Sequence, residues 1–175
     1  ANYTLSFASP KCTKKLAEYI ETRVTSSEKP LAPTTEYEVP ISKDVLTFLQ
    51  SHELGILSSI ERSGSISGAA VYYTMHDNRP YFMTKTGTRK ALNIVGNQHV
   101  ALTVVDEPKL QTVQMQGIVE AETDGLVKTE ILDKLIRSRQ YEKKDSLPPI
   151  MKLNGEFVIF RIRPTKFSYT DYGKQ

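Results

Sequence analysis

The stretch YFMTKTGTRKA, residues 81–91, combines the end of a strand, a turn and the beginning of a helix. Aromatic and apolar residues come first and are typical of a strand, and Gly87 then interrupts them. Thr88 is a favourable N-cap residue, and Gly96 with Asn97 supplies a stop signal one short helix later. The sequence therefore predicts a strand, a tight loop and a compact helix over residues 88–97.

The first turn of this helix carries two cations, Arg89 and Lys90, at the electrostatically unfavourable end. A helix N-terminus bears roughly half a positive charge, so each cation there costs about 0.3–1 kcal/mol. A bound anion reverses this argument, because backbone N–H groups, the hydroxyls of Thr84 and Thr88 and both cationic heads would converge on a phosphate. The alternative is a solvated turn whose cations face water, and the local pattern leaves both interpretations open.

Alternating apolar residues and short turns on either side of this stretch predict further strands. They are expected over residues 54–60, 66–75, 80–84, 100–105, 112–122 and 157–162, the last continuing irregularly to 172. Most of the connections are too short for parallel crossovers. Helices are expected after Ser42 and after Asp124, where apolar residues recur at helical spacing. The sequence predicts a mainly β fold, an antiparallel barrel with a few peripheral helices.

The first forty residues have a different character. Leu16, Ile20 and Val24 predict an amphipathic helix over residues 13–24, and residues 25–40 hold three prolines without any periodicity. We expect an N-terminal arm over residues 1–40 and a single domain over residues 41–175. A composition of 39% hydrophobic and 25% charged residues is typical of a folded protein.

Two further features narrow the ligand. The strand over residues 67–73 begins with Gly68, Ala69 and Ala70, whose small side chains allow either a flat ligand or a neighbouring strand to lie close. Gln114 and Gln116 are uncharged amides on a later strand. If they point inward they can pair with the polar edge of a heterocycle, and if they point outward they are ordinary surface residues.

Charge, cysteine content and hydropathy restrict the possible functions. A net charge of +3 is small for a nucleic-acid-binding protein. The single cysteine, Cys12, excludes an intrachain disulfide and suits a reducing compartment. No apolar run approaches a membrane span, and the first residues lack a signal-peptide pattern, so a cytoplasmic location is expected.

No residue pattern in the sequence indicates a metal centre or a catalytic set. The histidines, His52, His76 and His99, are isolated from one another and from other ligands at metal spacing. His99 is the one that we consider for haem. We name no catalytic residue, and we expect no metal.

Three segments, residues 81–94, 100–106 and 112–117, resemble the pyridoxamine 5′-phosphate oxidase-like FMN-binding split barrels. The resemblance covers about residues 45–165. It implies a split antiparallel β-barrel of Greek-key type, a homodimer, and FMN in a cleft at the subunit interface. It also implies an FMN-dependent oxidoreductase, in which hydride passes through flavin N5 to or from an unidentified small molecule.

The resemblance implies the following roles. The phosphate of FMN would be held by Thr88, Arg89 and Lys90. The end of the preceding strand would also touch the cofactor through Met83, Thr84 and Lys85. The small-residue strand would lie along the flavin ring with Ala69, Ala70, Val71 and Tyr72. A later strand, from the other subunit, would contact the ring or ribityl chain through Thr112 or Gln114.

The chain also departs from the family pattern. Pyridoxamine phosphate oxidases proper carry basic residues where this chain has Ala69 and Thr74, and their tryptophan-containing C-terminal signature is missing, since the chain has no tryptophan. Vitamin B6 oxidation is therefore not supported. The alternatives are a deazaflavin-dependent reductase of the same fold, or a non-catalytic protein that binds, stores or senses flavin or haem. Binding of single-stranded nucleic acid is disfavoured because the positive charge is confined to one loop.

Overall fold

A computed structural model describes residues 38–136 and 156–174 of the chain. The expected helix over residues 13–24, most of the proline-containing segment and the loop over residues 145–149 lie outside these ranges. The described elements are α2 (Lys43–Gln50), β1 (Leu54–Ile60), β2 (Ile66–His76), β3 (Arg79–Lys85), α3 (Arg89–Gly96), β4 (His99–Asp106), β5 (Gln111–Ala121), α4 (Gly125–Ile136), β6 (Phe157–Asp171) and the short 3-10 helix η2 (Tyr172–Lys174).

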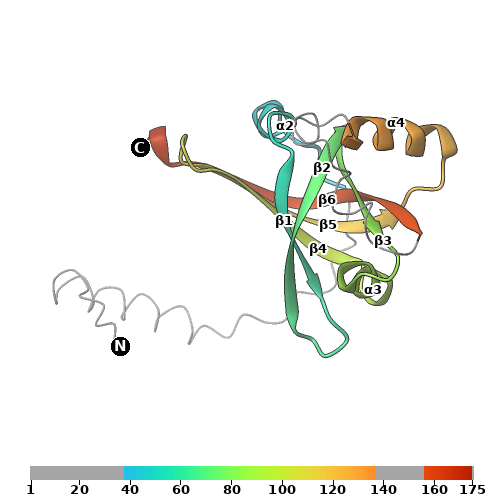
Figure 1. Ribbon diagram of the computed structural model, residues 1–175. Coiled ribbons are helices and arrows are strands. Elements are labelled where there is room, and N and C mark those ends of the chain that lie inside the picture. The colour runs from blue at the N-terminus through green and yellow to red at the C-terminus, as the bar shows by residue number, and fades with distance from the viewer. Residues whose placement is uncertain (1–37, 137–155, 175) are drawn as a thin grey trace, which may run out of the picture. The chain divides into compact units, whose positions relative to one another are not determined.

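The strands form a closed antiparallel barrel in the order β1-β2-β3-β6-β5-β4 (Figure 1). β1, β2 and β3 are joined by short turns, and the chain then returns through α3 so that β4 pairs with β1. A fourth strand that comes back to lie beside the first is the Greek-key arrangement. The prediction of a mainly β Greek-key barrel with peripheral helices is confirmed.

The interior of the barrel is filled by the inward-facing side chains of each strand. Leu57, Leu102, Val113 and Ile162 are fully buried, as period-two alternation requires of strands with one face in the core. α2 covers one end of the barrel with Val45, Phe48 and Leu49. The hydroxyl of Tyr73 on β2 donates a hydrogen bond of 2.9 Å to the carbonyl of Leu49, and this bond ties the helix to the sheet.

The last strand is longer than the sequence predicts. We expected a strand over residues 157–162 with an irregular continuation, but β6 is unbroken to Asp171 and pairs first with β3 and then with β5. Pro164, which would disrupt a regular ladder because it has no N–H, lies opposite Gly117 where the register shifts. A Cβ on Gly117 would lie 2.6 Å from the carbonyl oxygen of Arg163, so a side chain there would force the strands apart.

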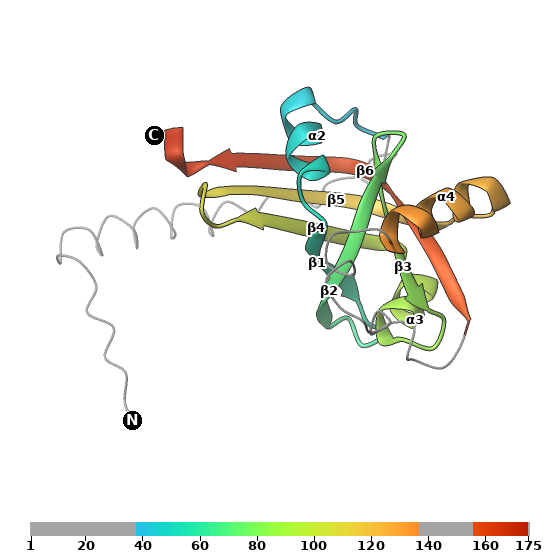
Figure 2. The ribbon, with the colours of Figure 1, turned by 45° about the horizontal axis from the view of Figure 1, so that its top comes forward.

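β2 and β3 separate along their length. They pair only where residues 73–76 face residues 79–82. Beyond this point residues 66–72 of β2 pair with β1, while residues 83–85 of β3 pair with β6. The two strands therefore diverge toward the start of α3 (Figure 2).

One side of the barrel carries paired charged residues from several strands. Arg79 of β3 makes two hydrogen bonds of 2.6 Å to Glu38, and Arg161 of β6 lies 2.9 Å from Glu120. The hydrogen bond from Arg79 is the main reason why the pKa of Glu38 is lowered. α4 packs beside this region through Ile131 and Leu135. The rest of the outer surface of the sheet has a different composition, described below.

Candidate functional site

The loop between β3 and α3 is held in shape by its own hydrogen bonds. The Thr88 hydroxyl donates to the carbonyl of Lys85 at 2.9 Å and accepts from the backbone N–H of Ala91 at 3.4 Å. The hydroxyls of Thr84 and Thr88 are 2.9 Å apart. Thr88 is the N-cap of α3, as the sequence predicts, and the two hydroxyls lie together at the positive end of the helix.

Three cations surround this helix start. Arg89 has a 77% exposed side chain, and its nearest described carboxylate, that of Glu61, is 3.9 Å away. Lys90 is half-buried, and desolvation lowers the pKa of its ammonium group. Lys85 is only 6% exposed, and its ammonium group lies 3.5 Å from the centre of the Phe157 ring. The solvated-turn interpretation thus suits Arg89, whereas Lys85 and Lys90 are partly withdrawn from water.

α3 is fixed against the barrel, so its N-terminus has a defined position. The side-chain amide of Asn93 donates a hydrogen bond of 3.1 Å to the Ser59 hydroxyl on β1, and both residues are buried. Ala91 and Ile94 are also buried beneath the helix. A buried polar pair of this kind costs stability when one partner is removed, because the other is left unsatisfied. The loop therefore presents its N–H groups and cations from a rigid support.

We expect Thr88→Ala to destabilise the apoprotein by about 1 kcal/mol, within the range measured for loss of an N-cap side chain. Thr88→Ser, which keeps the hydroxyl, should recover most of that stability. Chemical denaturation of the apoprotein measures both, with the exposed Thr86→Ala as a matched control. Equal stability of Thr88→Ala and the wild-type protein would mean that the hydroxyl does not cap α3.

The structure separates the expected ring-side residues into two groups. Ala70 is exposed, and Ala69 and Tyr72 are half-buried, whereas the side chain of Val71 lies in the barrel core. Val71 can therefore present only its backbone to a ligand. A Cβ on Gly68 would meet the side chain of Ile56 at an ordinary 3.6 Å. Close packing of β1 and β2 therefore does not require a glycine at this position.

The central outward-facing residues of β2, β1, β4, β5 and the second half of β6 form a continuous surface, which we call the outer sheet face. Strand pairing places them in adjacent rows. They are Gly68, Ala70, Tyr72, Leu54, Ile56, Ser58, Ala101, Thr103, Val105, Thr112, Gln114, Gln116, Lys166, Ser168 and Thr170. Lys166 is the charged residue within this central part, and the same side of β5 and β6 continues beyond it into Glu120, Arg161 and Arg163. Leu54, Ile56 and Val105 are large apolar side chains between 43% and 60% exposed.

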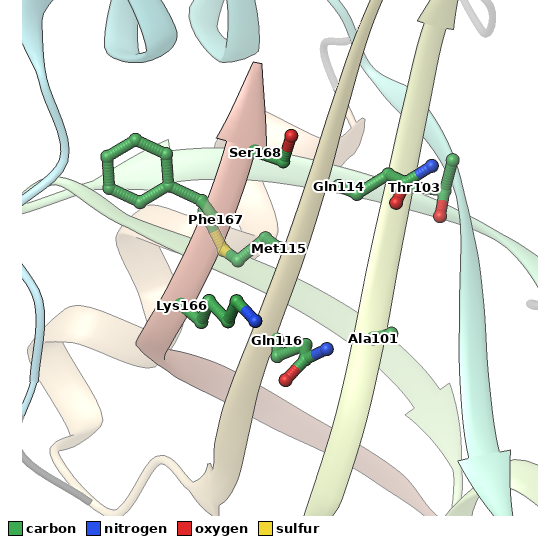
Figure 3. A pocket seen from close by; sticks show the side chains of 8 residues that line it. All are labelled: Ala101, Thr103, Gln114, Met115, Gln116, Lys166, Phe167 and Ser168. Atoms are coloured by element: carbon green, nitrogen blue, oxygen red, sulfur yellow. The ribbon is translucent and has the colours of Figure 1, made fainter. Parts of the chain in front are cut away.

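A shallow trough of about 370 Å³ crosses this face over β4, β5 and β6. Figure 3 shows the side chains of Gln114 and Gln116 on its floor, with Thr103 on one side and Ser168 and Lys166 on the other. Both glutamines point outward and are exposed, so the inward orientation considered above is wrong. Thr112 is half-buried, and its hydroxyl donates a 3.2 Å hydrogen bond to the carbonyl of Val104.

The expected ring contacts lie on one face but are not adjacent. Gln114 pairs with Thr103, Thr103 with Ile56, and Ile56 with Ala70. Three strand spacings correspond to about 14 Å. A three-ring heterocycle is shorter than this separation. The ring system alone therefore does not lie directly over both Ala70 and Gln114 of one chain.

The contribution of β6 to the trough was not predicted from the sequence. Lys166 pairs with Gln116, and Ser168 pairs with Gln114, so both β6 residues share the outward face of the glutamines. The alternation of outward and inward residues along 166–170 was a usable signal. Pro164 interrupts the alternation before this segment, so the expected continuation beyond residue 162 was an irregular one.

The histidines have structural neighbours of their own. His52 Nε2 lies 3.4 Å from the carboxylate of Asp106, and His76 Nδ1 lies 3.2 Å from that of Glu130. His99 Nδ1 is 2.9 Å from the side-chain oxygen of Asn97. Within residues 38–136 and 156–174 no group of three or more potential ligands is placed to hold a metal. The same residues include no helix long and apolar enough to cross a membrane.

The fold is a closed Greek-key barrel whose β3–α3 loop gathers hydroxyls and cations at a helix start, and the sequence comparison identifies the family. The family described as pyridoxamine 5′-phosphate oxidase matches residues 41–171, three quarters of the chain. The chain therefore belongs to the pyridoxamine 5′-phosphate oxidase family. No curated protein sequence matches it.

Solved structures share the fold at low identity. An F420 reductase is 24% identical with a TM-score of 0.57, over 73% of this chain and 98% of that protein. An FAD-binding protein from Mesorhizobium loti is 18% identical with a TM-score of 0.56, over 74% and 94%. The haem storage protein HutZ from Vibrio cholerae is 15% identical with a TM-score of 0.56, over 76% and 95%. These similarities establish the barrel fold of the chain.

Proposed function

We propose that this protein binds FMN and acts as a flavin-dependent oxidoreductase on a small molecule. The observation that carries the proposal is the start of α3, where the paired hydroxyls of Thr84 and Thr88 lie beside the cations Arg89 and Lys90. A phosphate at this position would accept hydrogen bonds from the helix N-terminus and would offset the positive charge gathered there. Membership of the family and the FAD-binding neighbour support a flavin as the carrier of that phosphate.

The residues present fit such a cofactor. Thr88, Arg89 and Lys90 would hold the phosphate, and the diverging strands would leave the exposed side of Ala70 and Tyr72 for the ring. When bound, FMN supplies hydride transfer at its N5 atom. The chain itself contributes orientation and exclusion of water. In this proposal no protein acid or base is assigned to the reaction.

The same proposal includes a homodimer. The outer sheet face is almost free of charge and exposes Leu54, Ile56 and Val105, and depletion of charge is typical of the centre of a protein interface. A second copy packed on this face would bring its own Gln114 toward the ring beside Ala70, which the first copy cannot do. Two-fold pairing of one surface with itself is the commonest form of assembly.

Cofactor extraction from the purified protein, followed by mass spectrometry, tests the proposal. We expect released FMN, and we expect apoprotein titrated with FMN to show the perturbed visible spectrum of a bound flavin. If the extract contains a deazaflavin, the proposed site stands and the cofactor is a deazaflavin in place of FMN. Apoprotein that binds neither flavin would contradict the proposal.

Haem is a second candidate because of one contact. The side-chain oxygen of Asn97 lies 2.9 Å from His99 Nδ1 and holds the imidazole ring, as partners of ligating histidines commonly do. HutZ, which shares the fold, is a haem storage protein. Addition of haem to the apoprotein should then produce a ligand-dependent absorption band that is lost in His99→Ala. If His99→Ala binds haem like the wild-type protein, this candidate is excluded.

A further inference from the structure

A second cavity lies between α4 and the first half of β6, on the outside of the barrel. We call it the α4 cleft, and its volume is about 270 Å³. Figure 2 shows α4 beside β2 and β3, with β6 running past it. The helix contributes Lys128, Thr129 and Leu132 to the cleft, and the strands contribute Met83, Glu122 and residues 157–159. None of these residues lines the trough of the outer sheet face, so the two cavities are separate.

The two flanks of α4 face different parts of the barrel. Ile131 and Leu135 form the stripe that is buried against the sheet. On one side of this stripe the carboxylate of Glu130 lies 3.2 Å from His76 of β2. At 3.6 residues per turn Lys128 lies on the other side, where it lines the cleft. The α4 cleft is therefore on the flank of the helix away from β2, the strand on which we place the flavin ring.

The walls of the α4 cleft are mostly apolar and are held in place. Met83 and Leu132 pack against the cluster between α4 and the sheet, and Ile159 is only 7% exposed. Phe157 is 39% exposed, and its ring is fixed by the ammonium group of Lys85, which lies 3.5 Å from the ring centre. Ligand sites are commonly preformed, mainly apolar clefts with a few polar groups, and this cavity has that composition.

Two charged side chains line the α4 cleft, and their states differ. The buried carboxylate of Glu122 accepts hydrogen bonds of 2.8 and 2.9 Å from the backbone N–H groups of Thr123 and Asp124. The bond from Asp124 is the main reason why the pKa of Glu122 is lowered, and Arg161 lies 3.5 Å from its second oxygen. Lys128 is exposed and forms no ion pair with a carboxylate of the described residues. The charge that remains for a ligand is positive.

We propose that the α4 cleft binds a small monocarboxylic acid with an apolar body the size of one aromatic ring. An apolar cavity of about 150 Å³ holds benzene, so about 270 Å³ has room for a ring and a short acid chain. The ring would pack between Phe157 and Leu132, and the carboxylate would pair with Lys128 at the mouth. A second carboxylate would be repelled by Glu122. This site requires no flavin.

Phenylacetate and its neutral analogue phenylethanol test the proposal. In purified protein with isotope-labelled methionine methyl groups, phenylacetate should shift the NMR signal of Met83 and leave that of Met115, which lines the trough, unchanged. Lys128→Met should weaken phenylacetate binding about fivefold, the upper end for a partly solvated ion pair, and leave phenylethanol binding unchanged. Lys43→Met removes an exposed lysine of α2 and should alter neither affinity.

A bulky side chain at the mouth of the cleft should exclude both probes. Thr129 is exposed, so Thr129→Trp should fold and place an indole over the cleft. Because the ring of the probe then stays in water, both affinities should fall more than about tenfold. Leu126→Trp is the matched control, since Leu126 is 85% exposed on α4 and lies outside the cleft.

The outcomes are distinct. If phenylacetate shifts Met115 in place of Met83, or if Thr129→Trp binds both probes like the wild-type protein, the α4 cleft is not the site. If Lys128→Met weakens both probes equally, the cleft does not select a carboxylate and the proposal is wrong. Binding of FMN, or its absence, bears on the proposed function alone.

Discussion

Replacement of Arg89 by alanine is expected to weaken FMN binding by about 1.5–3 kcal/mol, the range for hydrogen bonds to charged groups. This corresponds to a loss of roughly 10- to 150-fold in affinity. The Arg89 side chain is 77% exposed, and the carboxylate nearest to it among the described residues, that of Glu61, is 3.9 Å away. Its removal should therefore leave the stability of the apoprotein almost unchanged and act on the ligand alone.

Comparison of FMN with riboflavin identifies the part of the ligand that Arg89 meets. Riboflavin lacks the phosphate, so its affinity should be the same for Arg89→Ala and the wild-type protein. Lys109→Ala is a matched control, because Lys109 is also an exposed cation but lies in the turn between β4 and β5. If Arg89→Ala weakens FMN and riboflavin equally, Arg89 does not bind the phosphate.

A charge placed in the middle of the outer sheet face should have the largest effect on assembly. Ile56 is 47% exposed in the single chain and pairs with Ala70 and Thr103. Ile56→Glu should fold, because its carboxylate can reach water in the monomer. In a dimer the carboxylate would be buried without a partner, at a cost of about 3–5 kcal/mol, so the dissociation constant should rise more than about 100-fold.

Light scattering at low micromolar concentration measures this change. The wild-type protein is expected at twice 19.7 kDa and Ile56→Glu at 19.7 kDa. Leu126→Glu is the control, since Leu126 is an 85% exposed aliphatic residue on α4, outside the outer sheet face. A dimer that persists in Ile56→Glu would show that this face is not the interface. A monomeric wild-type protein that binds flavin would show that flavin binding does not require a dimer.

The features predicted for the loop between β3 and α3 depend on residues that are neighbours in the chain, and the structure contains them. Thr88 caps α3 and Asn97 ends it because capping involves residues within one helical turn. The antiparallel barrel could also be predicted from the sequence, since two-residue alternation and short turns leave few other arrangements for these strands. The cations Arg89 and Lys90 are unusual from the sequence alone, because the helix dipole has the same sign in every helix.

Other features depend on the pairing of strands that are distant from one another in the sequence. Alternation shows that Gln114 and Met115 point to opposite sides of β5, but the side that becomes the core is set by packing against β4 and β6. The length of β6 followed from pairing across a register shift that accommodates Pro164, which no local pattern reveals.

The sequence by itself determined an antiparallel β-barrel and a cationic helix start, because both depend on residues close together in the chain. Only the tertiary structure decided that Lys85 is nearly buried against Phe157, and that Lys166 and Ser168 share one face with Gln114 and Gln116. The physical reason is that burial and the composition of a face depend on register between strands that are distant in sequence. Register is a property of the assembled sheet.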